Sequence, residues 1–76
     1  MYENFDHGLL QQLIAARGWM PADFYRALTR AGEDITEPTV RDSLKGARTP
    51  SPRVWRAYAK FFGVTPESFC AEKSRV

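Results

Sequence analysis

The sequence predicts an all-α domain built from five short helices. Prolines tend to fall near expected helix starts and glycines just past expected helix ends, where helix chemistry favours them. Between these marks the apolar residues follow the roughly 3.6-residue rhythm of amphipathic helices, and no alternating pattern indicates strands. The chain has 76 residues, a length that supplies a single hydrophobic core. We therefore expect one domain over residues 1–76, with an ordered core over about 7–72 and flexible ends.

The first two helices are delimited by glycine and proline. A helix from about His7 to Arg17 carries leucines and an isoleucine on one face and ends at Gly18. A second helix begins at Pro21 and closes at Gly32, and Asp23 in its first turn complements the positive end of the helix dipole. The predicted inward face of this helix consists of Phe24, Ala27, Leu28 and Ala31.

The remaining helices begin at signals in which a hydroxyl side chain is followed by proline. Such a hydroxyl can accept a hydrogen bond from an amide at the helix start that otherwise has no partner. The third helix is expected over about Glu37 to Lys45, the fourth ends at Gly63, and a short final helix runs through Glu67 to Cys70. The three signals are Thr36 with Pro38, Ser51 with Pro52, and Thr65 with Pro66.

Charge is unevenly distributed along the chain, although the net charge is only +2. Residues 1–40 hold three basic and six acidic side chains, a net charge of −3. Residues 41–60 hold six basic side chains and one acidic side chain, a net charge of +5. This basic segment is a candidate surface for phosphate groups. Its basic residues are Arg41, Lys45, Arg48, Arg53, Arg56 and Lys60.

The inventory of reactive side chains argues against catalysis. The sequence has one histidine, His7, and one cysteine, Cys70, with neither a cluster of metal ligands nor a glycine-rich phosphate loop. We interpret His7 as a polar residue at the start of the first helix and Cys70 as a small buried apolar residue. We therefore expect no enzyme, no cofactor, no metal and no small-molecule ligand.

No segment of the sequence resembles a membrane span or a targeting signal. The apolar runs are shorter than the roughly 18 residues that a spanning helix needs. The N-terminal segment, with Glu3 and Asp6, lacks the basic and apolar regions of a signal peptide. We expect no membrane partner and a cytoplasmic location.

The predicted third helix has a narrow apolar face and a broad polar one. Val40 and Leu44 are four residues apart and share a face, with Ser43 beside them. A short helix of this kind suits insertion into the major groove of DNA, where side chains near the helix N-terminus read base edges. The competing interpretation is an ordinary solvated helix face. The residues left to point outward are Glu37, Pro38, Arg41, Asp42 and Lys45.

Several segments together resemble a known family. Residues 39–51, Thr-Val-Arg-Asp-Ser-Leu-Lys-Gly-Ala-Arg-Thr-Pro-Ser, join a short polar helix, a glycine turn and a basic loop. With residues 9–18, Phe24, Leu28 and the segment 62–66, Phe-Gly-Val-Thr-Pro, they resemble the lambda-repressor-like, or Cro/Xre, type of helix-turn-helix domain. The resemblance implies a sequence-specific double-stranded DNA-binding transcriptional regulator, of the phage, prophage or plasmid repressor type. It also implies operator binding as a homodimer in a bacterial or phage-infected cell.

The chain departs from the family pattern in four ways. The connection between the second and third helices is several residues longer than the family's tight turn. Met20 stands where the family has a polar capping residue. Ser43 replaces an apolar residue and Leu44 a glutamate, which rotates the expected inward face. The acidic Glu37 and Asp42, with Pro38, stand where neutral side chains usually read bases.

The outward residues of the third helix are the candidate base contacts. We hypothesise that Thr39 and Arg41 read base edges, the arginine by pairing with guanine O6 and N7. Glu37 and Asp42 either accept a hydrogen bond from cytosine or orient the arginine, and for Asp42 a plain exposed charge is the alternative. Pro38 belongs to the same surface.

Candidate phosphate contacts lie at the end of the third helix and in the segment that follows it, and also on the second helix. Arg26 and Arg30 are flanking candidates, and a solvated face of the second helix is the alternative for both. Lys45, Arg48, Thr49 and Arg53 lie in or beside the loop that should run along the DNA backbone.

Two other functions compete with DNA regulation. The acidic residues of the third helix favour a protein-interaction module, such as an antitoxin or adaptor. Trp19 among basic residues is compatible with RNA binding, although we interpret it as a core residue. For the dimer, we expect an apolar contact from Phe61, Val64, Phe69 and Cys70, with Tyr2 and Phe5 as the alternative.

Overall fold

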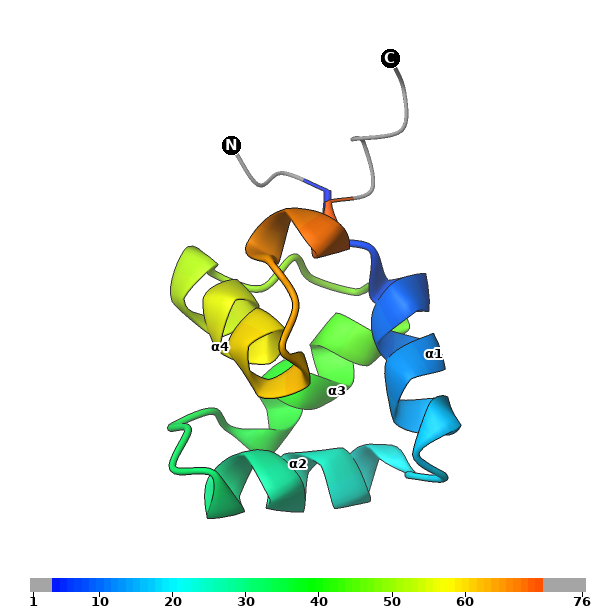
Figure 1. Ribbon diagram of the computed structural model, residues 1–76, viewed down its shortest axis with the longest axis vertical. Helices are drawn as coiled ribbons and strands as arrows, with labels where there is room; N and C mark the ends of the chain where they lie inside the picture. The colour runs from blue at the N-terminus through cyan, green and yellow to red at the C-terminus, as the bar shows by residue number, and fades with distance from the viewer. Residues whose placement is uncertain (1–3, 71–76) are drawn as a thin grey trace.

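The computed structural model describes residues 4–70, which form four α-helices and one short 3-10 helix. This confirms the all-α prediction for that part of the chain. The elements are α1 (His7–Ala16), α2 (Pro21–Arg30), α3 (Glu37–Lys45), α4 (Pro52–Phe62) and η1 (Pro66–Phe69). In Figure 1, α3 lies between α1 and α4, α2 crosses below, and η1 covers the opposite end. None of these helices combines the length and apolar character required to cross a membrane.

Helices α3 and α4 begin and end as the local sequence predicts. The Thr36 hydroxyl accepts from the Thr39 amide and the Ser51 hydroxyl from the Val54 amide, each at 3.4 Å. Gly46 ends α3 with a φ of 76°, a left-handed conformation that costs side-chain-bearing residues energy. These signals are local, and the bounds of both helices therefore agree with the prediction.

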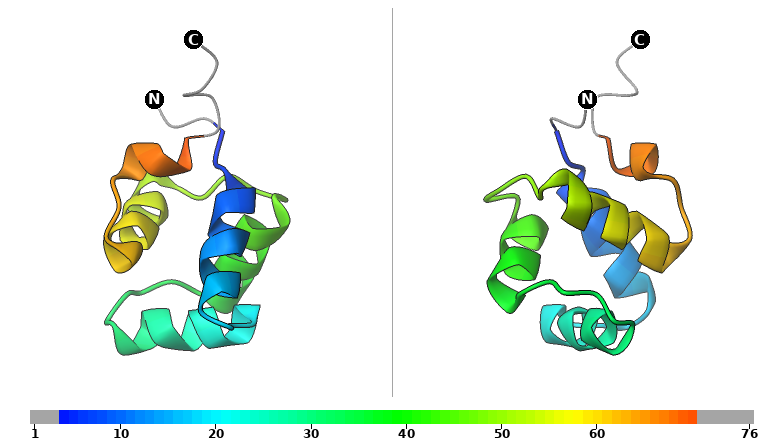
Figure 2. Two further views of the ribbon diagram at one scale, coloured as in Figure 1. Left: turned by 45° about the vertical axis from the view of Figure 1, so that its right-hand side comes forward. Right: turned by 90° about the vertical axis from the view of Figure 1, so that its left-hand side faces the viewer.

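The last predicted helix is a 3-10 turn rather than an α-helix. It spans Pro66–Phe69, and Cys70 after it has extended backbone, with φ −86° and ψ 113°. The Thr65 hydroxyl caps no amide and bonds the Ser68 hydroxyl at 3.2 Å instead. The physical reason lies in Cys70, which pairs with Phe5 in an antiparallel bridge and so draws the chain out of helical geometry. Figure 2 shows the two ends of the described chain together at one end of the molecule.

The hydrophobic core reaches further toward the N-terminus than predicted. Phe5 is 8% exposed, and its ring centroid lies 5.1 Å from those of both Trp55 and Phe69. The Asp6 amide donates to the Phe69 carbonyl at 2.7 Å, which fixes this segment against η1. The proposed roles of Phe5 and Phe69 in a dimer contact are therefore wrong, because both side chains are buried within one subunit. Tyr2 lies outside the described residues.

Trp19 packs against the core, as predicted, although it remains partly exposed. Its ring centroid is 6.4 Å from that of Phe24 and 6.0 Å from that of Phe61. The Arg17 guanidinium covers the outer side of this cluster, with its carbon 5.3 Å from the Trp19 centroid and 4.8 Å from that of Phe62. Cation–π contacts of this kind are favourable, and this arginine partly shields the rings from solvent.

Candidate nucleic-acid interface

The outward face of α3 is polar and accessible, as its sequence pattern predicts. Val40, Ser43 and Leu44 are the buried residues of the helix. Among the outward residues, Pro38, Arg41 and Lys45 are exposed, whereas Glu37, Thr39 and Asp42 are half-buried. Glu37 lies beside the start of α2, and Thr39 and Asp42 lie on the side of the helix that faces α4.

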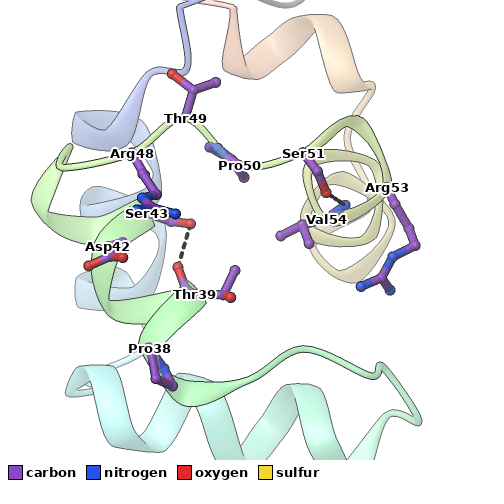
Figure 3. A pocket seen from close by; sticks show the side chains of 10 residues that line it. All are labelled: Pro38, Thr39, Asp42, Ser43, Arg48, Thr49, Pro50, Ser51, Arg53 and Val54. Carbon is purple, nitrogen blue, oxygen red and sulfur yellow. Dashed lines mark hydrogen bonds between the residues drawn. The ribbon is translucent and has the colours of Figure 1, made fainter.

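A groove of about 510 Å³ separates α3 from the start of α4 (Figure 3). Figure 3 shows the loop after Gly46 spanning the groove at one end, with Thr49 and Pro50 in the span. The groove gathers three predicted base contacts, Pro38, Thr39 and Asp42, and three predicted phosphate contacts, Arg48, Thr49 and Arg53. The structure therefore places these two sets of residues along one concave surface.

Glu37 and Arg41 lie on the other flank of α3. The Arg41 Nη2 atom donates to Glu37 Oε2 at 2.8 Å, one turn apart along the helix. Both residues line a shallow depression with Pro21 and Ala22 at the start of α2. The predicted base contacts are therefore divided between two sides of the helix.

The start of α2 carries its own negative charge. The Met20 amide donates to Asp23 Oδ2, and Arg26 Nη2 to Asp23 Oδ1, each at 2.8 Å. The Met20 amide and, secondarily, the Arg26 guanidinium hold the pKa of Asp23 below its usual value. A phosphate approaching this helix end would therefore meet the carboxylate of Asp23, whose charge is partly offset by Arg26.

The predicted phosphate contacts are only partly brought together. Arg26 and Arg30 line a separate groove with Trp19, Asp23 and Ala27, and neither lines either groove beside α3. Lys45 is exposed at the last position of α3. The structure thus groups Arg48, Thr49 and Arg53 with α3 and separates Arg26 and Arg30 from it.

A hydrogen-bond relay that positions α3 is absent from the sequence prediction. The Tyr58 hydroxyl on α4 donates to Ser43 Oγ at 2.9 Å, and Ser43 Oγ donates to the Thr39 carbonyl at 2.8 Å. Both side chains are fully buried, where such polar groups need partners. The available signal was a serine on the inward face of a helix: its hydroxyl can donate to a carbonyl of its own helix, which leaves its oxygen free to accept from a neighbouring element.

Contacts from both ends of the fold hold α3 and the loop that follows it. The Gln11 side chain on α1 donates to the Leu44 carbonyl at the end of α3. A Cβ at Gly46 would lie 2.8 Å from the His7 ring, so glycine also permits this close approach. At the other end, Arg53 Nη2 donates to the Asp34 carbonyl at 3.3 Å, which joins α4 to the α2–α3 connection.

The pH dependence of folding stability should show whether the Tyr58 hydroxyl of the relay is buried. Burial raises the pKa of Tyr58 from its ordinary 10.0 to about 12. Between these values the unfolded chain loses the phenol proton while the folded chain keeps it. The contribution of the buried phenol to folding stability is therefore complete below pH 10 and declines as the pH rises toward 12. We expect wild-type stability to fall by about 1–3 kcal/mol over this range through Tyr58 alone.

The Tyr58→Phe variant isolates this effect. We expect it to be less stable at pH 8 by about 1 kcal/mol, because the Ser43 hydrogen bond is lost. Urea unfolding at pH 8 and pH 11 measures the difference between variant and wild type. That difference should shrink or reverse at pH 11, and an unchanged difference would contradict a buried phenol.

Comparisons with protein-family models, with curated proteins and with solved structures found no match to this chain. Within residues 4–70, no group of three or more histidine, cysteine, aspartate or glutamate residues is placed to hold a metal ion. The candidate interface therefore rests on the geometry of α3, the loop after it and the start of α4.

Proposed function

We propose that this protein is a sequence-specific double-stranded DNA-binding transcriptional regulator with a lambda-repressor-like helix-turn-helix fold. It is of the phage, prophage or plasmid repressor type and binds its operator as a homodimer. One observation carries the proposal: the polar face of α3 stands beside a groove that also holds Arg48, Thr49 and Arg53. This juxtaposition supports simultaneous contact with base edges and with the adjacent phosphates.

In this proposal α3 enters the major groove and the loop after it follows the DNA backbone. Arg41 and Thr39 contact bases, together with the neighbouring Glu37, Pro38 and Asp42. Lys45 and three residues of the groove, Arg48, Thr49 and Arg53, contact phosphates. Arg26 and Arg30 have the weaker case, since the structure groups them on a different groove.

The α2–α3 connection makes this docking unlike that of a tight helix-turn-helix. Residues 31–36 join the two helices, whereas the motif usually has a turn of about three or four residues. Ile35 is 5% exposed and anchors the connection in the core. The Arg53 bond to Asp34 adds a second anchor, so α3 is held by α4 as well as by α2.

Dimerisation remains part of the proposal, with a smaller contact than the sequence suggested. With Phe5 and Phe69 buried, the residues left from the contact that the sequence suggested are the exposed Val64 and the partly buried Phe61 and Cys70. A two-fold dimer would bind two half-sites about one helical turn of DNA apart.

Fluorescence anisotropy tests the proposal. The purified protein is titrated against a labelled duplex from upstream of its own gene and against random-sequence duplexes, at two salt concentrations. We expect tighter binding to the upstream duplex, with log affinity falling against log salt at a slope of about −0.9 per phosphate neutralised. Weak binding that is equal for all duplexes, or insensitive to salt, would contradict the proposal.

A protein-interaction module, such as an antitoxin or adaptor, is the second candidate function. The observation that favours it is the neutralisation of Arg41 by Glu37, which lowers the attraction of α3 for phosphate. Under this function the α3 face contacts a protein, and the anisotropy experiment finds no preferred duplex.

A further inference from the structure

The Glu37–Arg41 ion pair lies in the first two turns of α3, where recognition helices contact bases. The inference drawn from it rests on the proposed function. The two groups meet at 2.8 Å, and the side chains of Arg41 and Glu37 keep 58% and 44% of their surface exposed. Since exposed ion pairs contribute little stability, the pair is not needed to hold the fold.

Local chemistry favours this pair. Glu37 is the first residue of α3, and a negative charge at a helix N-terminus is favourable. An acidic residue four positions before a basic one is also the better order for a helical ion pair. The other residues of the depression, Pro21, Ala22 and Val40, offer no side-chain hydrogen-bonding group. Among the residues that line this depression, Glu37 is therefore the one acceptor side chain for Arg41.

The structure describes all of α3, and on its N-terminal half Arg41 is the side chain best placed to donate a hydrogen bond to a base. Pro38 has no side-chain donor, and the Thr39 hydroxyl is bonded to the Thr36 hydroxyl at 2.9 Å. Asp42 faces the groove toward α4 instead. A base that met this flank of the helix would therefore meet the guanidinium and the carboxylate side by side.

We propose that Glu37 and Arg41 read one G·C base pair as a unit. In the major groove a G·C pair presents two acceptors on guanine, N7 and O6, and one donor on cytosine, the N4 amino group. One Nη2 hydrogen of Arg41 bonds Glu37 Oε2, which leaves donors of the guanidinium for guanine. Glu37 Oε1 accepts from cytosine N4. An A·T pair presents a donor between two acceptors and does not match this order.

In this assignment Glu37 is a positioning residue for Arg41 as well as a contact to cytosine. It restricts a flexible side chain to one orientation before DNA binds, which reduces the entropy lost on binding. Its charge also repels phosphates, so it weakens attachment to random DNA. Removing the carboxylate should thus lower sequence preference while raising general affinity, two opposite changes that a purely structural role would not produce.

The test begins with duplexes that the wild-type protein selects from a random pool. Each base pair of a selected duplex is then replaced in turn, and binding is measured for the wild type, Glu37→Gln, Arg41→Ala and Asp34→Asn. Asp34 is an exposed acidic residue in the α2–α3 connection, so its variant controls for the loss of one negative charge. A further duplex carries 7-deazaguanine, which lacks the N7 acceptor.

We expect one G·C position whose replacement weakens wild-type binding by about 5- to 100-fold. Arg41→Ala should lose this preference, because alanine has no side-chain donor for guanine O6 and N7. Glu37→Gln should lose most of it and bind random duplexes more tightly, whereas Asp34→Asn should keep it. Loss of the N7 acceptor in the 7-deazaguanine duplex should weaken binding by the wild type but not by Arg41→Ala.

The possible outcomes distinguish failure of this inference from failure of the proposed function. If the pool yields no preferred duplex, DNA regulation itself fails, and the reading of a G·C pair fails with it. If duplexes are selected but no G·C preference depends on Arg41, the function stands and the inference is overturned. A full preference retained by Glu37→Gln overturns the role of Glu37.

Discussion

The Arg41→Ala, Lys45→Ala double variant is expected to lose specific binding to its duplex while keeping its fold. Loss of the Arg41 contact to a base should cost about 1–3 kcal/mol of discrimination, and loss of the Lys45 phosphate contact should lower the salt slope by about one. Both side chains are exposed on α3, so folding stability should change by less than about 1 kcal/mol. Anisotropy and thermal unfolding measure the two effects.

A matched control separates the loss of specific contacts from the loss of charge. Arg56 and Lys60 are exposed on α4, and neither lines the grooves beside α3. The Arg56→Ala, Lys60→Ala variant also removes two positive charges, and it should bind the preferred duplex nearly as tightly as the wild type. Equal weakening in both double variants would mean that charge alone governs binding and that α3 is not the recognition element.

Replacing Phe5 by alanine is expected to remove a large part of the stability of the domain. The side chain is 8% exposed and contacts the rings of Trp55, Tyr58 and Phe69. Truncating a buried phenylalanine costs about 3–5 kcal/mol, whereas a chain of this length has a total stability of about 4–11 kcal/mol. Urea unfolding measures the loss.

The Phe5 experiment also decides between core and subunit contact. A core role predicts the same difference between variant and wild type at protein concentrations tenfold apart, because the lost contacts lie within one subunit and any dimerisation affects both proteins alike. Met20→Ala is the control, since Met20 is 69% exposed and should change stability by about 0.5 kcal/mol or less. A loss for Phe5→Ala that appears only at high concentration would place Phe5 between subunits instead.

The sequence predicts those parts of the fold that local chemistry determines. Thr36 and Ser51 cap helices through amides three residues away. The starts of α3 and α4 can therefore be predicted from a few neighbouring residues. The buried face of α3 follows from the spacing of Val40 and Leu44. The polarity of the opposite face is then known as well.

The sequence does not predict what depends on packing between distant segments. The extended backbone at Cys70 follows from its pairing with Phe5, and the burial of Ser43 depends on Tyr58 from another helix. The division of the α3 face likewise depends on α2 and α4, which place Glu37 and Arg41 on one flank and Asp42 on the other. Arg26 and Arg30 are separated from α3 for the same reason.

The contact between Phe5 and Phe69 has a consequence for how the chain is made. During synthesis the segment bearing Phe5 leaves the ribosome early, but its aromatic partners on α4 and η1 follow only near the end of the domain. Until then α1, α2 and α3 lack the core residues that α4 and η1 contribute. Joining such distant segments also carries an entropic cost of loop closure. Native packing around Phe5 therefore becomes possible only once η1 has been translated.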